Sequence, residues 1–138
     1  MRRMLDINEI EKMLPKSGKY LDISIDPNIG NYLTDVTNNV KFYEDDHSLT
    51  ICGAVSGKLT ATAISINAVQ LFTFSTDNTY LNMLIPLTTL VGEDGKAGFT
   101  MYECGENITI TCYTDLTGLS EGDTIMLFLN AVLLKDGE

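Results

Sequence analysis

The 138-residue chain has no tryptophan, one histidine, three cysteines and three prolines. One histidine cannot supply the imidazole cluster of a cupin-type metal centre. No G-x-S-x-G sequence offers a serine that His47 could activate. His47 follows two acidic residues in a predicted turn, where a solvent-exposed polar side chain is ordinary. We therefore expect that the chain is not an enzyme and needs no cofactor.

The cysteines, Cys52, Cys104 and Cys112, form no C-x-x-C pair and have no nearby histidine, so their spacing does not fit a zinc site. An odd number of thiols suits a reducing compartment, and Cys112 alternates with isoleucines as a small core residue. The acidic clusters at 44–46 and 93–94 lack the D-x-D-x-D-G spacing of a calcium loop. They are typical of exposed turns, and we predict no metal site.

Basic residues are also scarce, and the net charge is −10. Residues 1–19 have a balance of +2, whereas residues 20–138 have a balance of −12. Because an acidic body repels phosphate backbones, we expect no nucleic-acid partner. No apolar run reaches the length of a membrane-spanning helix, so we expect no membrane insertion. Acidic residues interrupt the first apolar stretch, which argues against a signal peptide and makes cytoplasmic synthesis the default.

The first segment has helical rather than strand periodicity. Residues 5–14 predict a short helix, with Asp6 and Glu9 as a capping box and Pro15 as a stop. Such a short helix is marginal alone in water and needs something to pack against. We predict that residues 1–19 are a helical attachment segment that docks to a larger assembly through Arg2, Arg3, Ile7, Ile10, Met13 and Leu14.

After residue 19 the apolar period changes to two, which is typical of half-buried strands. The pattern predicts an all-β domain over 20–138, an antiparallel β-sandwich or jelly roll that follows the short N-terminal α-helix. Pro86 places an edge strand or a bulge in its segment, because proline cannot donate a ladder hydrogen bond. The predicted strands are 21–25, 40–44, 48–52, 58–67, 69–75, 80–91, 99–103, 107–113 and 124–134.

The strand 124–134 is apolar on both faces, 80–91 is nearly so, and 69–74 breaks the alternation of apolar and polar residues. An outer strand of a lone sandwich should have one wet face. Two explanations stay open: a central strand buried within one subunit, or a strand whose second face is covered by another subunit. The second explanation predicts a subunit interface formed by Val69, Leu71, Phe72, Phe74, Ile125, Met126, Leu127, Phe128, Leu129 and Val132.

Residues 97–134 contain a Gly-aromatic strand, a Thr/Ile strand and then Gly122-Asp123-Thr124-Ile125, which opens the last apolar strand. This order resembles the closing hairpins of small jelly-roll heads on bacteriophage fibres, baseplates and capsid decorations. The resemblance implies a homotrimer that is held on the virion by its N-terminal segment and whose head binds a host-surface ligand. It also implies synthesis in the host cytoplasm followed by assembly into the virion.

Two functions follow as hypotheses. The first is a homotrimeric phage or phage-like virion structural protein. The alternative is a carbohydrate- or ligand-binding β-sandwich module of the bacterial cytoplasm. That alternative needs exposed aromatic side chains gathered on one sheet face, and the sequence offers no tryptophan and only scattered tyrosines.

Overall fold

The computed structural model describes residues 18–91 and 94–137. Within these residues, nine strands and two short helical elements follow one another. Their order is β1 (Lys19–Leu21), η1 (Ile29–Asn31), β2 (Leu33–Asn38), β3 (Lys41–Glu44), β4 (Ser48–Leu59), α2 (Ala61–Ile66), β5 (Ala68–Phe74), β6 (Met83–Val91), β7 (Asp94–Cys104), β8 (Ile108–Thr114) and β9 (Thr124–Leu134). The strand pairs are all antiparallel, so the all-β part of the prediction is confirmed.

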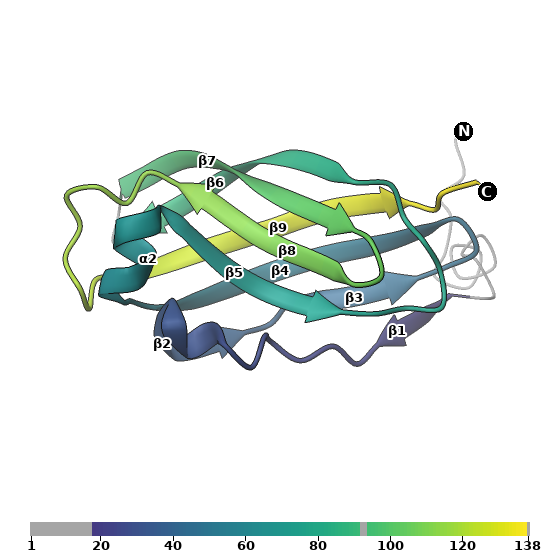
Figure 1. The fold of residues 1–138 in the computed structure, drawn as a ribbon, viewed down its shortest axis with the longest axis horizontal. Coiled ribbons are helices and arrows are strands. Elements are labelled where there is room, and N and C mark those ends of the chain that lie inside the picture. The colour runs from purple at the N-terminus through teal and green to yellow at the C-terminus, as the bar shows by residue number, and fades with distance from the viewer. Residues whose placement is uncertain (1–17, 92–93, 138) are drawn as a thin grey trace, which may run out of the picture.

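The strands form one hydrogen-bonded path in the order β1-β3-β4-β9-β6-β7-β8-β5, with β2 paired to β4. The path folds over at the contact between β9 and β6, which pair at only three positions. The result is a sandwich, and Figure 1 shows β5 and β8 crossing in front of β4 and β9. Strands β6, β7 and β8 are consecutive neighbours, and β5 lies beside β8, which is a Greek-key arrangement.

The core lies between the two layers. Phe42 on β3 meets Phe72 and Phe74 on β5 edge to face, with ring centroids 5.1 and 5.2 Å apart. In β9 the inward residues are buried and the intervening residues are exposed along the whole strand. Burial of these alternating apolar side chains is the main stabilising term of such a sandwich.

The segment after β1 is fastened to β5 by a buried carboxylate. The Oδ2 atom of Asp26 accepts hydrogen bonds from the Gln70 amide (2.9 Å) and the Thr73 hydroxyl (3.0 Å), and Oδ1 accepts one from the Asn28 N–H. Burial alone would raise the pKa of Asp26, but these hydrogen bonds outweigh it and hold the pKa below its usual value. The segment therefore covers the edge of β5 without completing the predicted strand 21–25, of which only Leu21 lies in β1.

Local side-chain chemistry explains the β3–β4 hairpin. Asp45 Oδ1 accepts the backbone N–H groups of His47 (2.7 Å) and Ser48 (2.8 Å), which closes the turn. These bonds, the His47 one first, hold the pKa of Asp45 below its usual value. The predicted hairpin of 40–44 and 48–52 is confirmed, and β4 continues to Leu59.

The predicted strand 58–67 is wrong, because most of it forms helix α2. Thr60 is the N-cap, and its hydroxyl accepts the Ala63 N–H at 3.2 Å. Asn67 ends the helix in the left-handed conformation with φ 55°. The two caps supply hydrogen-bond partners and a chain reversal that overcome the strand preference of the β-branched residues between them.

Strand irregularities account for two other sequence features. A register shift between Gln70 and Phe72 lets Leu71 and Phe72 both point into the core, so β5 does not alternate strictly. Pro86 lies in the part of β6 that pairs with β7 alone, since β9 reaches β6 only at 89–91. This single-sided pairing agrees with the edge position that proline predicts.

The predicted helix 5–14 lies outside the described residues. In the part that the structure describes, no helix is long and apolar enough to cross a membrane.

Candidate functional site: the outer face of β4 and β9

The structure divides the ten predicted interface residues by their burial. Six of them line the interior of their own sandwich: Val69, Leu71, Phe72, Ile125, Leu127 and Leu129. Phe74 is partly buried against the same core. These seven residues are covered within a single chain, so the interface prediction applies to the remaining three, Met126, Phe128 and Val132. The attachment residues Arg2, Arg3, Ile7, Ile10, Met13 and Leu14 lie outside the described residues.

Strand β9 presents a row of large apolar side chains to solvent. The exposed fractions are 37% for Met126, 42% for Phe128, 46% for Val132 and 54% for Leu134. Their neighbours in sequence, which point inward, are all buried. The outer face of this strand is therefore mostly apolar, with Asn130 between the two pairs of apolar residues, and only the inner face is covered.

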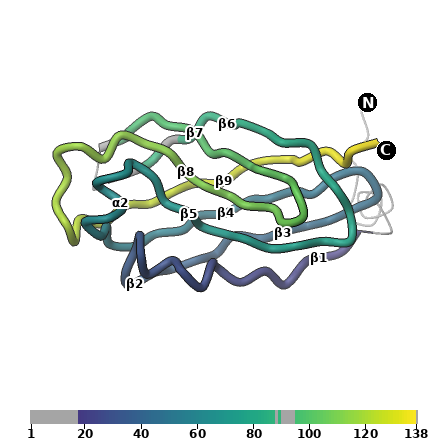
Figure 2. The backbone as a smooth tube through the Cα atoms, in the orientation of Figure 1, coloured from purple at the N-terminus to yellow at the C-terminus, as the bar shows by residue number. Residues whose placement is uncertain are grey.

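Strand β4 runs beside β9 over eleven paired positions and contributes small side chains to the same surface. Figure 2 shows the two strands side by side along the molecule's long axis. Ala54 lies opposite Phe128, and Cys52 lies opposite Asn130. Around them is a shallow depression of about 430 Å³. We call this surface the β4–β9 face; it consists of Ser48, Thr50, Cys52, Ala54, Ser56, Lys58, Thr124, Met126, Phe128, Asn130, Val132 and Leu134.

Gly53 allows β4 to pass close to the neighbouring backbone in the middle of this face. Its φ is +142°, and a Cβ there would meet the backbone of Val40 at 2.6 Å. At this point the strand that pairs with β4 changes from β3 to β2. Asn39 lies at the change, and its Oδ1 accepts the Ala54 N–H at 2.6 Å. Glycine and asparagine thus allow one long strand to support the full length of the face.

Two tyrosines extend the surface toward the sheet edge. Tyr43 on β3 pairs with Thr50, and Tyr20 on β1 pairs with Tyr43. Their ring centroids are 5.0 Å apart in an edge-to-face arrangement, and Tyr20 is 72% exposed. Aromatic side chains of this kind are enriched in protein interfaces.

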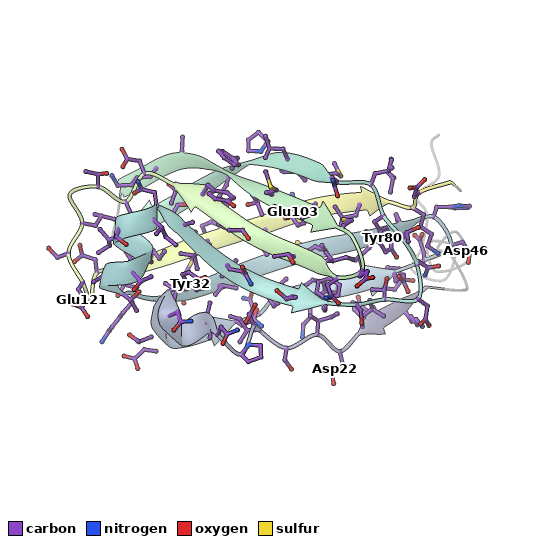
Figure 3. All side chains as sticks on the ribbon, viewed as in Figure 1. Asp22, Tyr32, Asp46, Tyr80, Glu103 and Glu121 are labelled. Atoms are coloured by element: carbon purple, nitrogen blue, oxygen red, sulfur yellow. The ribbon has the colours of Figure 1, made fainter. Side chains whose placement is uncertain are left out.

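The β4–β9 face contains no acidic side chain, although the chain has a net charge of −10. Its one charged residue, Lys58, is paired with Asp35 at 3.2 Å, and both side chains are well exposed. Acidic residues lie elsewhere: Figure 3 shows Asp46 and Glu121 at opposite ends of the sandwich. Depletion of charge at the centre of a surface is typical of a protein–protein interface.

Two buried titratable groups have raised pKa values. The Tyr80 hydroxyl donates to Glu44 Oε2, and burial together with that carboxylate raises the pKa of Tyr80. Burial raises the pKa of Cys112 to about 12, so this thiol stays protonated at neutral pH. Within 18–91 and 94–137, no three His, Cys, Asp or Glu side chains are arranged to hold a metal ion.

Comparison of the chain with protein-family models, curated proteins and solved structures finds no match.

Proposed function

We propose that this protein is a non-enzymatic structural module that associates with copies of itself through the β4–β9 face. The observation that supports the proposal is the row of four exposed apolar side chains on β9 beside the small side chains of β4. A strand that is already buried on its inner face gains nothing for its own subunit from an apolar outer face. A second subunit that covers the outer face would account for its apolar side chains.

The exposed apolar area of the face is compatible with a functional surface. If a large side chain presents roughly 200 Å² when fully exposed, the four β9 residues together expose roughly 350 Å². That value is within the range of roughly 300–600 Å² for the largest apolar patch of a monomer, which is often functional. With Ala54, Cys52 and the tyrosine pair at its margin, the face approaches the scale of a standard interface, roughly 800 Å² per partner.

The oligomer that we propose is a homotrimer of phage or phage-like virion type, with a jelly-roll head. The resemblance over residues 97–134 is the basis for both statements, and the exposed face of β9 lies inside that region. In this proposal residues 1–19 attach the trimer to the virion. Their charge balance of +2 against −12 for the rest of the chain supports a separate role for them.

The mass of the full chain in solution tests the proposal. Light scattering after size-exclusion chromatography, over a concentration series in the micromolar range, should give three times the mass of 15.2 kDa. A dimer would keep the interface and reject the trimer, because a face that meets only itself across a two-fold axis closes at two subunits. A monodisperse monomer over the whole series would overturn self-association.

A second mass measurement tests the attachment segment separately. A chain that lacks residues 1–17, and so keeps β1 complete, should keep its strand-type circular dichroism and its oligomeric mass. Unfolding of this shortened chain would show that the segment belongs to the body and would overturn the attachment role.

A further inference from the structure

An aromatic pair lies on the outer face of the second layer, away from the β4–β9 face. Phe99 on β7 and Tyr113 on β8 are direct cross-strand partners. Their rings are stacked, with centroids 5.1 Å apart and an interplanar angle of 27°. Phe99 remains 39% exposed. Their sequence neighbours Thr100, Cys112 and Thr114 are buried and point inward, so the two rings project from the opposite face of the sheet.

An open groove of about 320 Å³ adjoins this pair. Its large apolar side chains are Phe99, Tyr113 and Ile66. Ile66 comes from the end of α2 and is 52% exposed. Its volume is at the lower end of the range for small-molecule sites. The groove is therefore suited to a single small ring rather than to an extended ligand.

Polar groups of defined orientation border the groove on one side. Asn67 lines it, and its Oδ1 accepts the Leu116 N–H at 2.8 Å, which fixes the plane of the amide. Asp115 also lines it, and its Oδ1 accepts the Thr117 N–H at 2.9 Å. That hydrogen bond holds the pKa of Asp115 below its usual value. The groove thus offers an amide donor and an ionised acceptor beside an aromatic surface.

This combination selects among ligand classes. Strands β7 and β8 are paired on both sides, so no free strand edge is present here for a peptide to extend the sheet. The Asp115 carboxylate and the acidic body disfavour phosphates and acidic sugars. A neutral pyranose fits both parts of the groove, because it has an apolar C–H face and hydroxyl groups around its edge.

We propose that the groove between Phe99, Tyr113, Asn67 and Asp115 binds one neutral pyranose unit of a glycan. The outer ring face of the aromatic pair stacks on the C–H face of the sugar, and Asn67 and Asp115 hydrogen-bond to its hydroxyl groups. This site lies on the opposite layer from the β4–β9 face and does not depend on the proposed self-association.

Saturation-transfer NMR on the full chain tests the proposal. The probes are the methyl pyranosides of glucose, galactose, mannose and N-acetylglucosamine, each at about 10 mM, where millimolar affinities are detectable. At least one should receive saturation, most strongly at the protons of one ring face. Phe99→Ala should weaken its binding between about threefold and about tenfold, as expected for loss of one stacking partner. Asp115→Asn keeps the aromatic pair and should weaken binding through lost hydrogen bonding.

Leu84→Ala is the matched control, because Leu84 is an exposed apolar residue of the same layer, 59% exposed, that does not line the groove. Binding should be unchanged in this variant. The proposal is overturned if none of the four sugars receives saturation, or if Phe99→Ala binds as well as the unaltered chain. It is also overturned if Phe99→Ala changes the oligomeric mass, since the aromatic pair would then belong to a subunit interface.

Discussion

Two adjacent residues of β9 allow the inner and outer faces of the strand to be tested by the same chemical change. Phe128 faces outward and is 42% exposed, whereas Leu129 faces inward and is 2% exposed. Aspartate at position 128 should dissociate the oligomer and leave the subunit folded. Aspartate at position 129 should unfold the subunit. The prediction depends on the position of each side chain relative to the sheet, because the two residues are neighbours in sequence.

The magnitude for Phe128→Asp follows from the area that a partner would cover. A fully exposed phenylalanine presents roughly 200 Å², so 42% exposure leaves roughly 80 Å² for the partner. At about 25 cal/mol per Å², covering that area contributes about 2 kcal/mol per subunit. Its loss raises the dissociation constant about 30-fold, and removing a carboxylate from water adds to that change.

The magnitude for Leu129→Asp is set by the interior. Burying an unpaired carboxylate in an apolar core costs several kcal/mol, in addition to the lost packing of leucine. This cost is a large part of a total stability of about 5–15 kcal/mol. We expect Leu129→Asp to lack a cooperative thermal transition, whereas Phe128→Asp keeps one.

Light scattering for mass and circular dichroism for folding measure the two outcomes. Leu84→Asp is the matched control, because it places the same acid on an exposed apolar position of the opposite layer. A Phe128→Asp protein with unchanged mass would refute the interface argument. A folded Leu129→Asp protein would refute the assignment of that residue to the core.

Three further predictions concern single residues. Cys52 is the exposed thiol of the β4–β9 face, so a short bismaleimide should link subunits covalently, and Cys52→Ser should abolish the linked band on a denaturing gel. Thr60→Ala removes the N-cap of α2 and should lower the free energy of unfolding by about 1 kcal/mol, measured by urea denaturation; an unchanged midpoint would contradict the capping role. Because the pKa of Asp26 is lowered in the fold, its contribution to stability is present above the ordinary aspartate pKa of about 4 and is lost as the pH falls through the folded value. Asp26→Asn should therefore lower the urea midpoint at pH 7 and flatten its decline in acid, whereas parallel pH profiles would show that the carboxylate is not responsible.

The strands that the sequence predicts best are those whose period-two pattern is closed by turn chemistry. Residues 124–134 form β9 over the predicted range, and Asp45 closes the predicted hairpin. The segment 58–67 was predicted as a strand because threonine and isoleucine are β-branched. The segment forms a helix because Thr60 and Asn67 cap its two ends. These caps act only where the chain reverses direction, which the sequence pattern of the segment does not show.

The candidate sites depend on information that no single strand contains. An apolar pattern on both faces of 124–134 does not show which face is buried, because burial depends on the strands that pack against each face. The predicted interface therefore mixed interior Leu129 with exterior Phe128. The Phe99–Tyr113 pair depends on the register between β7 and β8. The sequence hints at this pairing only through Gly98, which precedes Phe99. A Cβ at position 98 would collide with the Tyr113 carbonyl.

The three-position pairing of β9 with β6 has a consequence for synthesis of the protein. Among the described strands, this is the pair that joins the two layers by hydrogen bonds. Strand β9 is also the last of the nine to leave the ribosome. Until it arrives, β4 has one open edge along its whole length, and the core lacks the five buried side chains of β9. Closure of the sandwich therefore waits until β9 has been synthesised, and a chain that stalls or is cut short before β9 presents β4 as a template for the wrong partner.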